Sequence, residues 1–450
     1  MVQQNDLSEQ AKSYFSQIFS TLKVSQHLRQ AGIRKSYGFS CYTVFQILFQ
    51  LVFQSRNLFR ILESDRAESM PRRDVYYRFL NEPRFNWRRF LQLLCTRVVG
   101  QFETLTSTQR VRVFIVDDSS VLRNRSKKVE LLARCYDHVF HRFFRGFQLL
   151  TLGWSDGYSF APLDFSMMSS SKEENRYNGI REGIDKRLCG FKRRAESILH
   201  KPDVVVQMID RALRAGFSAD YLLVDSWFTN MPLVQKMLER GMHIIGRVKD
   251  AKQRYAYQGK MLTLSDIRAL FPEKGKAEIL GGVQVKASSG EDLKIAFVRN
   301  RNKRNEWMAI LTTDVALDDK EVVRIYGMRW AIEPFHKMIK SHLKLEKEFE
   351  GRSYDMMISH TTIVFSRYLI LEWERRNNND DRTFGGMFYL FCDEVKDMDL
   401  KMALRQLMAF AFLLMSDQTN RKTVIRQVLD WIDQLPNWIK ALWPVSLCES

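Results

Sequence analysis

The sequence predicts a mixed α/β fold with helical regions on either side of the core. From residue 110 to residue 313, short β-branched and apolar runs alternate with amphipathic segments, as in a sheet covered by helices. Before residue 105 and after residue 354, apolar residues instead recur at spacings of three and four, the period of a helix. With 450 residues, 45% of them apolar, the chain can form a large core and additional modules.

Residues 1–105 are the predicted N-terminal helical region. The run "CYTVFQILFQLVF" (41–53) is too short and too interrupted by Gln to cross a bilayer, so we expect a buried helix. Arginines alternate with aromatic residues in "SMPRRDVYYRFLNEPRFNWRRF" (69–90), a composition that suits a DNA-binding module. A helical cap with solvated arginines fits the same pattern. Arg72 and Arg73 are our candidate DNA contacts in this region.

Residues 106–249 are the first part of the predicted core. "VRVFIVDDSS" is a strand that ends in two aspartates, and "QLLTLGWSDG" and "FAPLDFSMM" complete an antiparallel meander. The stretch from Arg176 to Gly216 is predicted to be helical, with Pro202 at the start of its last helix. "YLLVDSWF" is a buried strand, Pro232 opens another helix, and "HIIGRVK" is the next strand.

The rest of the chain divides into three predicted regions. Residues 250–306 consist of short alternating runs separated by Gly and Ser, which indicates a β-rich insertion. Residues 307–350 return to the core with the strand "WMAILTTD" and one long helix from Asp319 to Glu350. Residues 351–450 form a C-terminal helical region.

Charge points to a polyanionic partner. Seventy Lys and Arg against 52 Asp and Glu give a formal net charge of +18, which favours nucleic acid. The six cysteines are scattered without a CxxC pair, as expected in the reducing cytoplasm. His138 and His141 have no third metal ligand near them in the sequence, so we expect no zinc site. We also expect no signal peptide and no membrane partner.

The stretch "YGMRWAIEPFHKMIK" (326–340) carries an unusual stripe. At about 100° per residue, Tyr326, Arg329, Glu333 and Lys340 fall on one narrow face of a helix, beside an apolar face. Pro334 should kink the helix or restart it close to Glu333. An intrahelical ladder of ion pairs explains the stripe equally well, because Arg329 and Glu333 are four residues apart.

Three carboxylates occupy positions from which they can converge. Asp118 and Asp225 end two core strands, and Glu333 lies on the helix that follows the last strand. Carboxylates that lie close together need cations, and such oxygen ligands suit Mg²⁺ or Mn²⁺. Two such ions can activate a water and stabilise a leaving oxygen in phosphodiester chemistry. A single aspartate at a strand end is, however, more often a turn or cap residue.

At these residues the chain resembles a known family. Tyr326, Arg329, Glu333 and Lys340 match the Y-(2)-R-(3)-E-(6)-K signature of a group of bacterial insertion-sequence transposases of the DDE superfamily. "VDDSS" and "YLLVDSWF" resemble the first and second aspartate motifs of that group. The resemblance spans residues 110–345 and implies a ribonuclease H-like core interrupted by a β insertion. Pro334 departs from the pattern, and Asp117 competes with Asp118 as the first acid.

The resemblance also implies an activity. Asp118, Asp225 and Glu333 would hold two Mg²⁺ or Mn²⁺ ions, and Tyr326, Arg329 and Lys340 would grip phosphates. The reaction would be cut-and-paste transposition: cleavage at paired terminal inverted repeats, hairpin formation, and joining of the 3′ ends to target DNA. Trp307 is the candidate ring for a flipped base, although a Trp packed at a strand edge is the simpler interpretation.

The same resemblance implies an oligomeric state and a cellular location, and two alternative functions remain. We expect a homodimer in a synaptic complex, with 351–450 as the candidate dimerisation region, in a bacterial cytoplasm and bound to the nucleoid through DNA. One alternative is a metal-dependent ribonuclease H-like nuclease without strand transfer. Another is a non-catalytic DNA-binding descendant, against which the complete set of acids and the complete signature argue.

Overall fold

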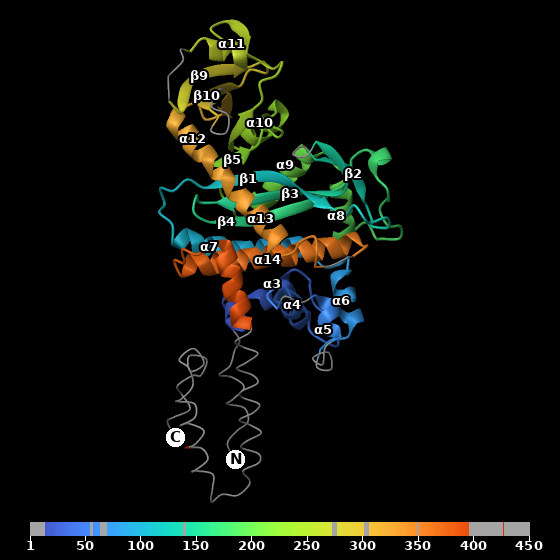
Figure 1. Ribbon diagram of the computed structural model, residues 1–450. Helices are drawn as coiled ribbons and strands as arrows, with labels where there is room; N and C mark the ends of the chain where they lie inside the picture. Colours follow the sequence, from blue (N-terminus) through green and yellow to red (C-terminus); the bar gives the residue numbers. More distant parts are fainter. Residues whose placement is uncertain are drawn as a thin grey trace, which may run out of the picture.

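The computed structural model describes residues 14–54, 57–63, 70–137, 141–271, 277–300, 306–348, 351–395 and 426. Figure 1 shows a central sheet, the long helices α7 and α14 along one side of it, and the short helices α3 to α6 beyond them. The strands and helix of residues 254–299 project from the opposite side (Figure 1). The mixed α/β fold with helical flanks is therefore confirmed.

The described part of the N-terminal region is helical, as predicted. Its helices are α2 (Tyr14–Thr21), α3 (Val24–Gln30), α4 (Cys41–Gln50), α5 (Leu58–Leu62), α6 (Arg73–Leu80) and α7 (Trp87–Thr104). Ser40, Asn57 and Asn86 cap three of these helices, because each side chain accepts a backbone N–H of the first turn. The predicted buried helix is α4, whose Phe45 and Phe49 are fully buried beside Phe19.

The central sheet has the strand order of a ribonuclease H-like core. Its strands are β1 (Val113–Leu122), β2 (Ala133–Asp137), β3 (Arg142–Ser155), β4 (Phe160–Met168), β5 (Tyr221–Val224) and β6 (His243–Val248). β1, β3 and β4 form an antiparallel meander, while β5 pairs parallel with both β1 and β6. The order β4-β3-β1-β5-β6 agrees with the predicted core.

Two local predictions in the core were incomplete. β2 was not predicted, because "ARCYD" is short and mostly polar; it pairs with an extension of β3 that begins at Arg142. The predicted helical stretch 176–216 is helical only in α8 (Cys189–Ser197) and α9 (Lys201–Arg214), apart from single turns. Asn178 instead donates side-chain hydrogen bonds to the carbonyls of Lys127 and Val129, which holds this segment against the loop after β1.

The segment after β6 extends the same sheet. α10 (Met231–Leu238) precedes β6 and has Pro232 in its first turn, as predicted. After β6 come β7 (Arg254–Tyr257), β8 (Lys260–Thr263), α11 (Leu264–Ala269), β9 (Ile279–Ala287), β10 (Asp292–Arg299) and β11 (Trp307–Thr312). β11 lies between β6 and β10, antiparallel to both. Leu264, Leu293 and Phe297 belong to a second hydrophobic cluster, separate from the main core.

The predicted long helix after β11 is broken. α12 (Asp319–Gly327) passes through a 3-10 turn (Met328–Ala331) into α13 (Ile332–Ser341). Pro334 explains the break, because its ring lacks an N–H and is tolerated only near the start of a helix. α13 then ends at Ser341 rather than continuing to Glu350, and Lys344 takes a left-handed backbone conformation shortly afterwards.

α14 (Tyr354–Asn377) is buried along nearly its whole length between the sheet and the N-terminal helices (Figure 1). Its charged side chains are paired with other parts of the chain. The Nη1 of Arg367 lies 2.5 Å from Glu348 Oε2, and Arg194 Nη2 of α8 lies 2.7 Å from Asp355 Oδ2. Residues 384–395 form one further helical stretch, and the predicted helices beyond residue 395 lie outside the described residues.

None of the helices in the described ranges is both long enough and apolar enough to cross a membrane.

We predict that Arg367→Leu lowers the free energy of unfolding by about 3–5 kcal/mol, because Glu348 is 1% exposed and would lose its guanidinium partner. Thermal and urea unfolding of the purified variant measure this loss. Arg382→Leu is the control, since Arg382 is half exposed beside Asp380 and such pairs contribute at most about 1 kcal/mol. Equal stability of the two variants would show that the buried pair does not support α14.

Candidate active site

Asp117 and Asp118 point to opposite faces of the sheet, because successive side chains of a strand alternate. On one face, Asp117 Oδ2 lies 3.7 Å from Arg329 Nη1 and 3.9 Å from Nδ1 of His336 on α13. On the other face, Asp118 forms an ion pair with Lys201 at the start of α9. α13 therefore covers the face of Asp117, and α9 the face of Asp118.

The register of β1 and β5 brings Asp225 to Asp117. The parallel pairs run from Val113 with Tyr221 to Ile115 with Leu223, and the same register continued by two residues sets Asp117 beside Asp225. Asp225 Oδ1 accepts backbone N–H groups from Trp227 at 2.9 Å and Phe228 at 3.1 Å, which orients the carboxylate at the strand end.

The geometry therefore favours Asp117 over Asp118 as the partner of Asp225. The sequence favours Asp118, because that residue directly precedes the hydroxyl pair Ser119 and Ser120. β1 in fact continues to Leu122 along β3, and only its pairing with β5 stops at Ile115. Asp118 faces Lys201 instead of the other two acids.

The signature residues reach this centre from α12 and α13. Arg329 Nη2 lies 3.0 Å from Glu333 Oε1, so one guanidinium contacts both Glu333 and Asp117. Tyr326 is partly buried nearby, and burial raises its pKa, with a further contribution from the charge of Asp225. Because Arg329 bridges α13 to β1, an intrahelical ladder alone does not account for the stripe.

Lys340 lies at the other end of α13. Its Nζ donates a 2.6 Å hydrogen bond to the carbonyl of Ser120 and lies 4.0 Å from Glu346. Burial lowers the pKa of Lys340, against the neighbouring carboxylates of Glu346 and Asp137. Lys340 therefore anchors α13 to β1 three residues beyond Asp117.

The centre is short of positive charge. Burial raises the pKa of Asp117 to about 7, with further increases from Asp118 and Asp225, despite the opposing charge of Arg329. Burial also lowers the pKa of His336 to about 3, helped by Lys340 and Arg329, so this ring is neutral at pH 7. His336 Nε2 is buried without a hydrogen-bond partner in the described part of the chain. An added cation would stabilise the charged form of Asp117.

The donor chemistry fits a divalent cation, although the side chains are not gathered around a single point. Carboxylate oxygens of Asp117, Asp225 and Glu333 are the ligand type that Mg²⁺ and Mn²⁺ prefer. Within the described ranges, no three His, Cys, Asp or Glu side chains are arranged as a metal-binding group, since Glu333 is turned toward Arg329. The side chain of Glu333 is 43% exposed and can turn without leaving a packed position.

The other predicted DNA contacts lie away from these acids. Arg72 and Arg73 are exposed at the start of α6, which packs against α4 and α14 on the side of α14 away from the sheet (Figure 1). Arg73 stacks on Tyr77, with 5.2 Å from its guanidinium carbon to the ring centroid. Arg88, from the same basic stretch, is instead mostly buried and 2.9 Å from Asp164, so it is structural.

Trp307 has packing partners of its own. It lies at the start of β11 and contacts Phe297 edge-on, with 5.4 Å between the ring centroids. The ring is partly buried against the second hydrophobic cluster.

Several residues of the site were not singled out from the sequence. Trp227 is 43% exposed two residues after Asp225, and Lys201 Nζ lies 4.9 Å from its ring centroid. Trp330 is 57% exposed beside Arg329, whose guanidinium carbon lies 5.4 Å from that ring. Trp227 lies in "YLLVDSWF" and Trp330 in "YGMRWAIEPFHKMIK", so their closeness to Asp225 and Arg329 in the sequence could have indicated them. No sequence signal indicates that Lys201 and His336 lie near β1, because their positions depend on how α9 and α13 pack on the sheet.

Two family models match parts of the chain. A family model described as "DDE superfamily endonuclease" matches residues 53–261, and one described as "Transposase DDE domain" matches residues 199–352. Residues 53–352 are thus similar to DDE-superfamily models. The first match includes Asp117 and Asp225, and the second includes Asp225 and Glu333.

Solved structures similar to this chain include the piggyBac transposase in a synaptic complex with hairpin DNA, determined by cryo-electron microscopy. The identity is 11%, the TM-score is 0.45, and the comparison covers 96% of this chain and 84% of that one. No curated protein matches the chain.

We predict that Asp117→Asn stabilises the metal-free protein at high pH. The pKa of Asp117 is raised from 3.8 to about 7 in the folded protein. Between these two pH values the folded protein keeps a proton that the unfolded chain has released. The free energy of unfolding therefore falls as the pH rises from about 4 to 7. The gain from Asn should be absent near pH 4 and reach at most about 4 kcal/mol above pH 7. Unfolding midpoints in EDTA at pH 5 and pH 8 measure it.

Asp118→Asn is the control, because it removes the partner of Lys201 and should give no gain at pH 8. A lower midpoint for Asp117→Asn at pH 8 would mean that its ion pair with Arg329 outweighs the cost of burial.

Proposed function

We propose that the protein is a cut-and-paste DNA transposase that cleaves transposon ends, forms hairpins and transfers strands to target DNA. The observation that carries the proposal is the register that sets Asp117 beside Asp225, together with the contacts of Arg329 with both Asp117 and Glu333, in a part of the chain that matches DDE-superfamily models. The formal net charge of +18 supplies the long-range attraction for DNA. The Y-(2)-R-(3)-E-(6)-K signature favours the bacterial insertion-sequence group.

In this proposal Asp117, Asp225 and Glu333 hold two Mg²⁺ or Mn²⁺ ions, and Asp117 replaces Asp118 as the first ligand. Bound ions would supply an activated water and stabilise the leaving oxygen of the phosphodiester. The raised pKa of Asp117 supports the assignment, because a cation would restore the charged carboxylate at neutral pH.

The protein's own residues position the DNA. Arg329 presents a planar guanidinium that matches a phosphate, and its contacts with Asp117 and Glu333 fix its orientation. Lys340 contributes a second cation further along β1. His336, neutral and buried against Asp117, separates that carboxylate from water on its inner side.

Hairpin formation requires a base to leave the duplex and stack on a ring. The exposed Trp227 and Trp330 lie next to site residues in the chain and suit this role better than Trp307, whose edge packs on Phe297. The partners are duplex DNA, both as terminal inverted repeats and as target, bound by a homodimer in a synaptic complex. Arg72 and Arg73 contact the transposon end in this scheme, on the strength of their exposure.

We predict that Asp117→Asn, Asp225→Asn and Glu333→Gln each reduce cleavage of an end-containing duplex by more than about 100-fold while DNA binding is retained, because each loses an anionic oxygen. Cleavage gels with Mg²⁺ or Mn²⁺ and a mobility-shift assay measure both properties. Asp118→Asn is the matched control and should stay within a few-fold of the parent.

A pre-cut end with a free 3′-OH, incubated with supercoiled target DNA, separates transposase from nuclease. Joined products are expected of the transposase; cleavage without any joining would favour the nuclease alternative. Full cleavage by Asp117→Asn together with loss in Asp118→Asn would return the first acid to Asp118.

We predict that Arg72→Ala/Arg73→Ala weakens binding of the full chain to end DNA and lowers the slope of log K against log salt by roughly 1.8, or about 0.9 per phosphate contact. Fluorescence anisotropy over a salt series measures the slope. Arg78→Ala/Arg84→Ala is the control, because these arginines are already paired with Asp74 and Glu82. Identical slopes for the two double variants would exclude α6 as a phosphate-binding surface.

A further inference from the structure

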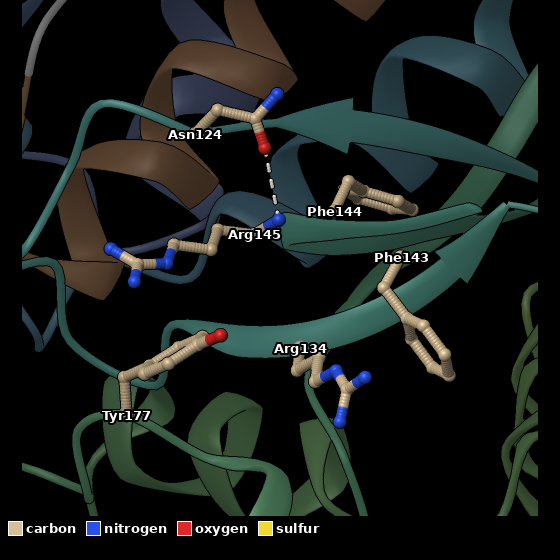
Figure 2. Close-up of a pocket in the computed structure, with 6 residues that line it drawn as sticks. All are labelled: Asn124, Arg134, Phe143, Phe144, Arg145 and Tyr177. Atoms are coloured by element: carbon tan, nitrogen blue, oxygen red, sulfur yellow. Dashed lines mark hydrogen bonds between the residues drawn. The ribbon is translucent and has the colours of Figure 1, made fainter.

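A hollow of about 230 Å³ lies on the β2–β3 hairpin, beside the loop that follows β1. Figure 2 shows its lining side chains on β2, on β3 and on the segments that flank them. The lining residues are Asn124, Arg134, Phe143, Phe144, Arg145 and Tyr177. Neither the signature motifs nor the three acids belong to this hollow, so the proposed chemistry leaves it without a role.

Arg134 and Arg145 start from opposite positions of this hollow, and their guanidiniums extend in opposite directions, toward Phe143 and Tyr177 (Figure 2). Arg134 and Arg145 are direct partners in the antiparallel register of β2 and β3, and both are exposed. Like charges at opposite positions destabilise a strand pair, and here the two side chains turn away from each other. No carboxylate of the described residues forms an ion pair with either arginine, whereas buried arginines such as Arg194 and Arg367 each have one. Both guanidiniums are therefore open to an anion.

Each arginine also stacks on an exposed aromatic ring. The guanidinium carbon of Arg134 lies 3.8 Å from the ring centroid of Phe143, and that of Arg145 lies 4.7 Å from the centroid of Tyr177. Phe143 is 57% exposed and Tyr177 is 45% exposed. The arginines cover part of each ring and leave aromatic surface open to solvent, which suits the flat face of an unpaired base.

Backbone hydrogen bonds hold the hollow in shape. Asn124 Oδ1 accepts the N–H of Arg145 at 3.0 Å, a contact drawn in Figure 2. Tyr177 donates its N–H to the carbonyl of Leu132 at 2.7 Å, beside β2. The positions of the rings and cations are therefore set before a ligand arrives, which reduces the entropy lost on binding.

The hollow opens on the same sheet face as the candidate active site. The register of β1 and β3 pairs Asp117 with Thr151 and Val121 with Phe147, so these residues share one face. Arg145 follows in the same alternation, two residues from Phe147. At about 3.4 Å per residue, the end of β1 lies roughly 17 Å from Asp117. Lys340 contacts β1 between the two positions.

We propose that this hollow, the Arg134–Arg145 site, binds single-stranded DNA, with one phosphate at each of the two guanidiniums and unpaired bases on Phe143 and Tyr177. The inference rests on the proposed function for its biological setting, in which the bound strand is one that leaves the active site. Single-stranded rather than duplex DNA fits because paired bases keep their faces stacked inside the helix and cannot lie on the rings.

The test measures binding of the full-length protein to a fluorescent single-stranded oligonucleotide of arbitrary sequence, in EDTA, by anisotropy. Arg134→Gln/Arg145→Gln should weaken binding about tenfold or more and lower the salt slope by roughly 1.4, since each contact to a single strand contributes about 0.7. Phe143→Ala and Tyr177→Ala should each weaken binding at least about fivefold, whereas Phe143→Trp should retain it.

Arg187→Gln/Arg382→Gln is the matched control, because it removes two exposed positive charges that are already paired with Asp185 and Asp380. Parent-like binding by the Arg134 and Arg145 double variant would overturn the proposal. An equal loss for blunt duplex DNA would also overturn it and assign the surface to duplex phosphates. Because the assay needs neither cleavage nor a transposon end, its result is independent of whether the chain transposes DNA.

Discussion

The burial of α14 is the constraint on which the other elements depend. A helix enclosed on nearly all sides cannot leave charged groups unpaired, because each would lose its hydration without compensation. Its partners come from distant parts of the chain: Glu348 pairs with Arg367, Arg194 of α8 pairs with Asp355, and Asp156 after β3 pairs with Arg376. These pairs set the sheet and the N-terminal helices against α14, and the position of α13 over β1 follows from that arrangement.

In the candidate centre, by contrast, a buried charge is compensated only in part. Asp117 is held in a position where its own charge is unfavourable, between Asp225 and the neutral ring of His336, and Arg329 compensates for it only in part. A folded protein keeps such an arrangement when a ligand supplies the missing charge, and the cost is then part of its affinity for that ligand. The stabilisation from the ion pairs of α14 offsets the cost of burying the carboxylate of Asp117.

Much of the fold could be predicted from the sequence because hydrophobic periodicity marks strands and helices, and Pro202 and Pro232 mark helix starts. The choice between Asp117 and Asp118 could not, because neighbouring residues of a strand differ only in the face to which they point, and that depends on the register with β5. Arg88 and Arg194 look like surface cations in the sequence, and only tertiary contacts show that they are internal. The Arg134–Arg145 pair could not be predicted either, because it depends on β2, a strand too short and too polar to recognise in the sequence.

The position of β11 between β6 and β10 governs how the molecule can move. Ala309 to Thr312 are paired with β6 on one side and β10 on the other, so paired strands lead from β5, beside Asp225, through β6 and β11 to β10. A hinge at this junction would have to break this pairing. The strand pairing therefore keeps the projecting strands at a fixed distance from the acids. A long bound molecule that contacts both must adjust its own curvature to that spacing.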